Sequence, residues 1–101
     1  MTLEDQPMGE EPDKGVLGFE EKHTIAIMTF LSINGECQKI EIYRNVSSNP
    51  RIPDKLDRLE AMGLLTQTST KGSRSMIIAL TPKGRQVADR LLELDRIIKT
   101  D

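Results

Sequence analysis

A hairpin pattern between helical patterns constrains this 101-residue chain more than any other feature. Leu64–Ser69 and Ser75–Leu80 predict two strands, since the second is rich in apolar residues and the loop between them, Thr70–Ser73, has hairpin length and contains a glycine. Helical patterns come before and after the hairpin. The length fits one domain, and this order predicts a mostly helical α+β fold.

A first helix is predicted from about Glu20 to Ile33. Its apolar residues lie nearly all round the helix axis, which predicts burial on most sides. The same run could form a strand, because Asn34-Gly35 is also a hairpin signal. The helix is favoured because the segment is long and Gly35 suits a helix C-cap.

Two further helices are predicted before the hairpin. Gln38–Val46 has apolar residues at every third position. The next helix begins between Pro50 and Pro53 and ends at Met62, with Asn49 as a candidate N-cap. Together they predict a helix-turn-helix that leads directly into the hairpin.

The last helix is predicted to begin at Thr81-Pro82, with the threonine as N-cap, and to run to about Ile98. Its apolar arc is wider than packing on one small domain usually requires. We therefore expect residues 82–99 to form a homodimerisation helix, although packing within the monomer alone is the alternative. The predicted interface residues form the main apolar stripe: Val87, Leu91, Leu94 and Ile98.

Charge is distributed unevenly along the chain, whose net charge is −2. Residues 1–14 contain five acidic residues and one lysine, whereas residues 37–85 contain nine basic and four acidic residues, a net charge of +5. Acidic residues, prolines and glycines together predict a disordered tail over residues 1–18, ahead of a domain at 19–101. The tail could fold back on the basic middle of the chain and compete with an anionic partner.

Two motifs flank the predicted hairpin. Leu56–Leu65 carries two leucines three positions apart, followed by Gly-Leu, and Ala79–Arg85 carries Leu-Thr-x-Lys-Gly. Together they resemble the motifs of winged helix-turn-helix transcriptional regulators of the MarR and PadR types and their small archaeal relatives. The resemblance covers roughly residues 22–99. It implies three helices, a two-stranded wing with its tip at Thr70–Arg74, and a long C-terminal helix. It also implies a recognition helix at Pro50–Met62 that enters the major groove of double-stranded DNA, and a dimer joined by terminal helices.

The predicted DNA-binding residues are polar or basic and lie on the third helix, at its start or at the wing tip: Asn49, Arg51, Lys55, Arg58, Lys71 and Arg74. The three basic residues from 51 to 58 are spaced 4 and 3 and share one helix face, where they can contact guanine or phosphate. The alternative is that these are ordinary solvent-exposed charges. Asp54 and Asp57 lie beside them and would repel phosphate, unless they orient the arginines.

Other functions find less support in the sequence. The chain has one histidine and one cysteine, which are too few for a Cys/His metal cluster. The sequence shows no phosphate-binding loop and no paired acidic residues, so neither an enzyme nor a bound cofactor is predicted. No signal peptide or membrane span is expected, which predicts a cytoplasmic protein. Cys37 is a candidate redox sensor, with a small residue near a helix start as the alternative. The main rival function is a winged helix that contacts another protein in a larger assembly.

Overall fold

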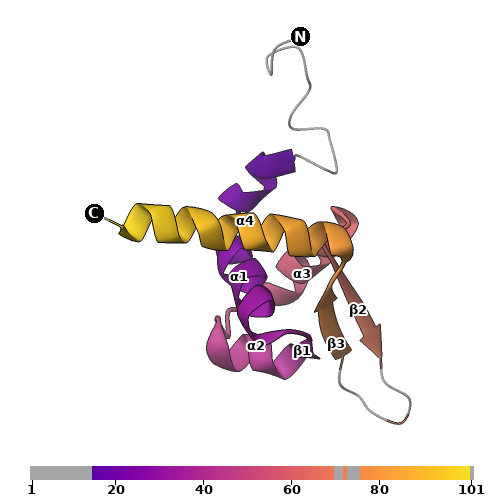
Figure 1. Ribbon diagram of the computed structural model, residues 1–101. Helices are drawn as coiled ribbons and strands as arrows, with labels where there is room; N and C mark the ends of the chain where they lie inside the picture. The colour runs from indigo at the N-terminus through magenta and orange to yellow at the C-terminus, as the bar shows by residue number, and fades with distance from the viewer. Residues whose placement is uncertain (1–14, 70–71, 73–75, 101) are drawn as a thin grey trace.

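The computed structural model describes residues 15–69, 72 and 76–100 (Figure 1). All four predicted helices and both predicted strands are present, and the largest boundary shift is at the start of the first helix, at Thr24 instead of Glu20. The elements are η2 Gly15–Glu20, α1 Thr24–Asn34, β1 Cys37–Gln38, α2 Lys39–Asn45, α3 Ile52–Ala61, β2 Leu65–Ser69, β3 Met76–Leu80 and α4 Pro82–Lys99.

The sheet has a third strand that the sequence pattern did not predict. Its order is β1-β3-β2, and both pairings are antiparallel. In β1, Cys37 lies opposite Ile78, whereas the hairpin runs in register from Leu65 opposite Leu80 to Ser69 opposite Met76. A two-residue strand shows no alternation, so only its pairing with β3 reveals it.

The helices and the sheet enclose one aliphatic core. In Figure 1, α4 lies across α1, and the β2–β3 hairpin extends away from the helices at one end. Every element from α1 to α4 except β1 contributes a fully buried side chain, because each amphipathic element must bury its apolar face against another. The largest are Ile27, Met28, Leu31, Ile42, Ile52, Leu56, Leu59, Leu65 and Ile78.

Helix α1 is buried on one side only, so the prediction that it is covered on most sides is wrong. Its buried residues are Thr24, Ile27, Met28 and Leu31, whereas Ile25 and Ile33 are exposed. The helix also starts later than predicted, because His23 adopts a left-handed conformation with φ 72°. The prediction that Gly35 ends this helix is confirmed by its φ of 80° and its N–H bond to the carbonyl of Leu31.

The predicted tail ends earlier than residue 18. Residues 15–18 belong to the 3-10 helix η2, and Gly18 is buried against Met62. A Cβ atom at this glycine would lie 2.9 Å from the Met62 Cε atom, so a larger residue would require the end of the Met62 side chain to move. The rest of the predicted tail, residues 1–14, lies outside the described residues.

The first turn of α4 confirms the predicted cap. The backbone N–H of Gly84 donates to the Thr81 hydroxyl at 2.9 Å, and Pro82 occupies the first helical position, where its missing N–H costs nothing.

Among the helices that the structure describes, none combines the length and the apolar character that a membrane span needs.

Candidate nucleic-acid interface

A turn stabilised by side chains positions α3 after α2. The Ser47 hydroxyl accepts a hydrogen bond from the N–H of Asn49 at 3.1 Å, and the Asn49 side chain accepts one from the N–H of Arg51 at 2.8 Å. Asn49 therefore fixes the turn, while Arg51 is the N-cap residue and Pro53 lies in the first turn. The predicted cap at Asn49 lies two residues too early, because Pro53 has no N–H to donate and is tolerated only in the first turn of the helix.

The angular positions of the α3 side chains divide its solvent-facing side into two flanks. Ile52, Leu56 and Leu59 are fully buried and define the inner face. Since successive residues are about 100° apart, Arg51 and Arg58 lie on one flank, which we call the basic flank. Asp57 and Glu60 lie on the other, which we call the acidic flank. The predicted recognition helix therefore carries both charges, on opposite flanks.

Lys55 does not share the exposure of the two arginines, contrary to the prediction. It is only 8% exposed, because it lies one turn from both Ile52 and Leu59, at the edge of the inner face. Within the described residues, the Lys55 ammonium has neither a hydrogen-bond nor an ion-pair partner. Since the described residues contain no buried side-chain nitrogen or oxygen that lacks a partner, the ammonium nitrogen itself is not buried. The stem is therefore covered and the ammonium group reaches water at the rim.

Arg58 is paired across the fold rather than along its own helix. Its Nη2 atom lies 3.3 Å from the Oε1 atom of Glu21, in the segment between η2 and α1. The prediction that Asp54 or Asp57 orients the arginines is wrong for Arg58, because Arg58 pairs with Glu21 instead. Arg51 is exposed, and among the described residues its guanidinium has no partner, so it is the more accessible base of the pair.

The acidic flank is joined to the hairpin through one amide side chain. The Gln67 Nε2 atom donates to Asp57 Oδ1 at 2.8 Å and to Glu60 Oε1 at 3.1 Å. The backbone N–H of Gln67 also donates to Glu60 Oε2 at 3.1 Å. The sequence analysis missed this cluster. Alternation along β2 was the available signal, because Gln67 shares a strand face with the buried Leu65 and therefore points towards α3.

The predicted wing tip cannot be compared with the structure, because Lys71 and Arg74 lie outside the described residues. Gly72 between them is described, and its φ of 80° lies in the left-handed region that a hairpin turn uses. The described strands β2 and β3 extend away from the helices (Figure 1).

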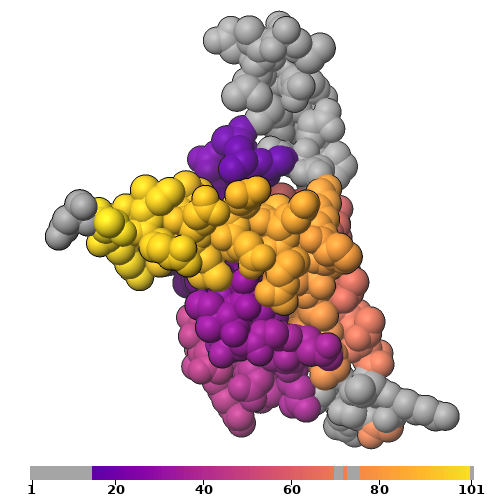
Figure 2. Space-filling model, viewed as in Figure 1, coloured from indigo at the N-terminus to yellow at the C-terminus, as the bar shows by residue number. Residues whose placement is uncertain are grey.

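The predicted dimerisation stripe on α4 divides into two halves. Val87 and Leu91 pack against the core of their own chain. Leu94 is 53% exposed and Ile98 is 80% exposed, and Ile97 beside them is 62% exposed. In Figure 2 the C-terminal end of α4 extends beyond the rest of the domain. We call Leu94, Ile97 and Ile98 the apolar end of α4.

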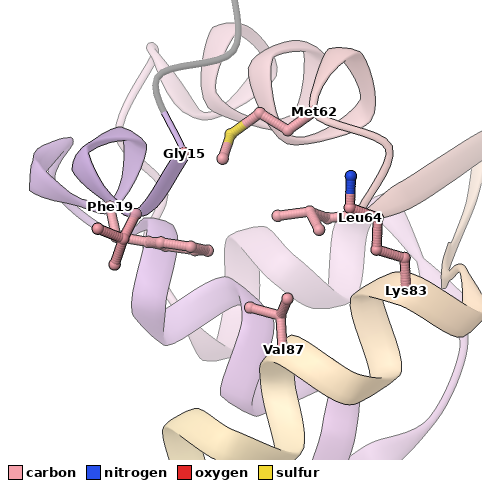
Figure 3. A pocket seen from close by; sticks show the side chains of 7 residues that line it. Gly15, Phe19, Met62, Leu64, Lys83 and Val87 are labelled. Atoms are coloured by element: carbon pink, nitrogen blue, oxygen red, sulfur yellow. The ribbon is translucent and has the colours of Figure 1, made fainter. Parts of the chain in front are cut away.

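An apolar cavity of about 260 Å³ lies where η2, the end of α3 and the start of α4 meet. Phe19, Met62, Leu64 and Val87 point into it, and the Lys83 side chain extends along one side (Figure 3). The cavity shows that η2 is an integral wall of the domain. Gly18 of η2 packs against Met62, the residue that follows α3.

Cys37 is half-buried in β1. Burial raises the pKa of its thiol, and the nearby carboxylate of Glu41 raises it further. Only the thiolate reacts readily with oxidants. The surroundings of this cysteine therefore oppose the reactivity that a redox sensor requires.

Several solved structures share this arrangement. The transcriptional regulator homologue protein from Pyrococcus horikoshii OT3 aligns with a TM-score of 0.69 at 20% identity, over 82% of this chain and 86% of that chain. Disulfide-formed AbfR aligns with a TM-score of 0.61 at 24% identity, over 82% and 59% of the two chains. Reduced AbfR bound to DNA aligns with a TM-score of 0.60 at 26% identity, over 81% and 62%.

The chain has a winged-helix fold. The predicted fold class is thereby confirmed, with a third strand added to the hairpin. One of these structural neighbours is a transcriptional regulator homologue and another is bound to DNA, and the chain spans about three fifths of the AbfR chain. No protein-family model and no curated protein matches the sequence.

Proposed function

We propose that this protein binds double-stranded DNA as a regulator of transcription, with α3 in the major groove and the hairpin on the flanking backbone. The observation that carries the proposal is the basic flank of α3, presented by a helix-turn-helix in a fold shared with DNA-bound AbfR. An α-helix fits the major groove, and an exposed arginine at its start, Arg51, is able to form two hydrogen bonds to guanine. Such a regulator acts in the compartment that holds the DNA, for which we propose the cytoplasm.

The proposed DNA contacts come from two places. Arg51 and Arg58 approach from α3, and Lys71 and Arg74 approach from the wing. Lys55 contributes only through its ammonium group at the rim of the buried face. Asn49 acts by shaping the turn that presents Arg51, since its side-chain oxygen is already bonded to the Arg51 N–H.

We propose a homodimer joined through the apolar end of α4. Leu94, Ile97 and Ile98 have large exposed areas, and exposed apolar patches on soluble domains mark interaction sites. The half-buried Val87 and Leu91 then support the helix from within the monomer. A symmetric dimer would present two recognition helices to one face of the duplex, about 34 Å apart.

A fluorescence-anisotropy titration with random-sequence duplex DNA, at low and then moderate salt, tests the proposal. We expect binding that weakens as salt rises, because neutralised phosphates release counterions. Substituting Arg51, Lys71 and Arg74 together by alanine should abolish it. The matched control is Arg96→Ala, which removes an exposed base from the far end of α4. Equal loss in the control, or no binding at low salt, would contradict the proposal.

A second candidate function is a module that binds another protein, and the three exposed carboxylates of α3 favour it. Asp54, Asp57 and Glu60 are all exposed on α3, beside only two arginines. This surface suits a basic peptide better than it suits phosphate. The same titration separates the two functions. No duplex binding at low salt, together with binding of an arginine-rich peptide that is lost in Asp54→Asn, would support the protein-binding module.

A further inference from the structure

The ion pair between Glu21 and Arg58 joins the predicted recognition helix to the segment that precedes α1. The two charged atoms lie 3.3 Å apart, and the side chains are 44% and 38% exposed. The pair is therefore accessible to an approaching phosphate. It also occupies the guanidinium of one of the two bases on the basic flank of α3.

The backbone holds Glu21 in a fixed position. Its carbonyl oxygen accepts hydrogen bonds from the Thr24 hydroxyl at 2.7 Å and from the Thr24 N–H at 3.3 Å. Thr24 is fully buried, and His23 between them is left-handed. On the other side of Glu21, Gly18 is packed against Met62 at the end of α3. The carboxylate is thus presented by an anchored turn, which lowers the entropy lost on forming the pair.

We propose that Glu21 is a positioning residue that restrains Arg58 and thereby weakens the binding of DNA by the basic flank. This inference rests on the proposed function. Arg58 must exchange the carboxylate for a phosphate oxygen before it can contribute to DNA binding. Arg51, which has no partner among the described residues, makes no such exchange.

The direct test compares Glu21→Gln with Glu20→Gln in the full chain. Both variants remove one negative charge, at adjacent positions, but Glu20 has no ion-pair partner among the described residues. Exposed ion pairs are weak, so we expect the dissociation constant for random duplex DNA to fall about two- to fivefold further in Glu21→Gln than in Glu20→Gln. The slope of log K against log salt should steepen by about 0.9, as one more phosphate is neutralised.

A second set of variants shows whether Glu21 acts through Arg58. The gain from Glu21→Gln should disappear in an Arg58→Ala background and persist in an Arg51→Ala background. Glu21→Asp keeps the charge but shortens the side chain, so tighter binding in this variant would report the loss of the ion pair rather than of the charge. A merely structural role for the pair would change the thermal midpoint of unfolding and leave the salt slope unchanged.

The outcomes separate the inference from the proposed function. Equal affinities for Glu21→Gln and Glu20→Gln would overturn the inference alone, as would a gain that survives Arg58→Ala. The absence of binding by the unmodified protein and by every variant would overturn the proposed function, and the inference with it.

Discussion

The hydroxyl of Thr81 donates a hydrogen bond to the carbonyl oxygen of Gly63 at 2.6 Å. The same hydroxyl accepts the N–H of Gly84, and the Thr81 N–H donates to the carbonyl of Leu64 at 3.1 Å. One residue thus caps α4 and connects it to the turn that follows α3. The orientation of α3 relative to α4 depends on this junction.

Replacing Thr81 by alanine should destabilise the protein by about 2 kcal/mol, since it removes the helix cap and leaves the Gly63 carbonyl without its partner. Thr81→Ser keeps both hydrogen bonds and should cost much less. Urea unfolding followed by circular dichroism measures the difference. Equal losses of unfolding free energy in the two variants would show that the hydroxyl is unimportant.

Gly84→Ala should be more severe, although alanine is normally the better helix former. A Cβ atom at this position would collide with the carbonyl oxygen of Leu64, and backbone atoms cannot move aside cheaply. We expect a loss of about 3 kcal/mol in the free energy of unfolding. Gln86→Ala, at an exposed position of the same helix, is the control and should be nearly neutral.

Gln67→Ala should loosen the hairpin from α3. The substitution removes the two side-chain hydrogen bonds to Asp57 and Glu60 and returns those carboxylates to water. We expect a cost of about 1 kcal/mol, because the cluster is exposed. Amide hydrogen exchange in β2 should become faster. Thr68→Ala, on the outer face of the same strand, should leave exchange unchanged, and a similar effect in both variants would exclude a specific role for the amide.

Leu94→Glu should convert a dimer into a monomer if the apolar end of α4 forms the interface. A charge placed in an apolar contact must be desolvated without a partner, which is costly. Sedimentation equilibrium of the two proteins measures the change. Gln86→Glu adds the same charge to an exposed position nearer the start of α4 and should leave the mass unchanged. A monomeric unmodified protein would refute the interface.

Cys37 should react slowly with iodoacetamide in the folded protein. Because burial and Glu41 raise the pKa of its thiol, less thiolate is present at a given pH than in the unfolded chain. The rate should rise with pH in both states, with the folded profile displaced to higher pH. Mass spectrometry after timed quenching gives both profiles. A folded profile displaced to lower pH would instead support a sensing role.

The order of the elements follows from local sequence patterns. Thr81-Pro82 predicts the start of α4 through cap chemistry that involves only neighbouring residues. The ion pairs Arg85–Asp89 and Lys99–Asp95 follow from the four-residue spacing of a helix, and the structure forms both, at 3.9 Å and 3.1 Å. In each case the interacting groups lie within one helical turn.

The burial of Lys55 shows where local patterns become insufficient. Its spacing from Arg51 and Arg58 correctly places all three on adjacent parts of the helix surface. The width of the buried face depends on how closely the neighbouring elements cover it, and that face extends to Lys55. The sequence alone therefore predicts which residues share a face, but not how much of that face remains exposed.

By itself, the sequence determined the helix-turn-helix, the hairpin and the amphipathic last helix, because periodicity and caps act over a few residues. Tertiary structure alone decided that β1 pairs with β3, that Gln67 joins the hairpin to the acidic flank, and that Glu21 engages Arg58. The partners in these contacts are distant in sequence or on different elements. No local preference specifies such pairs, and they form only when burial of the shared core brings the elements together.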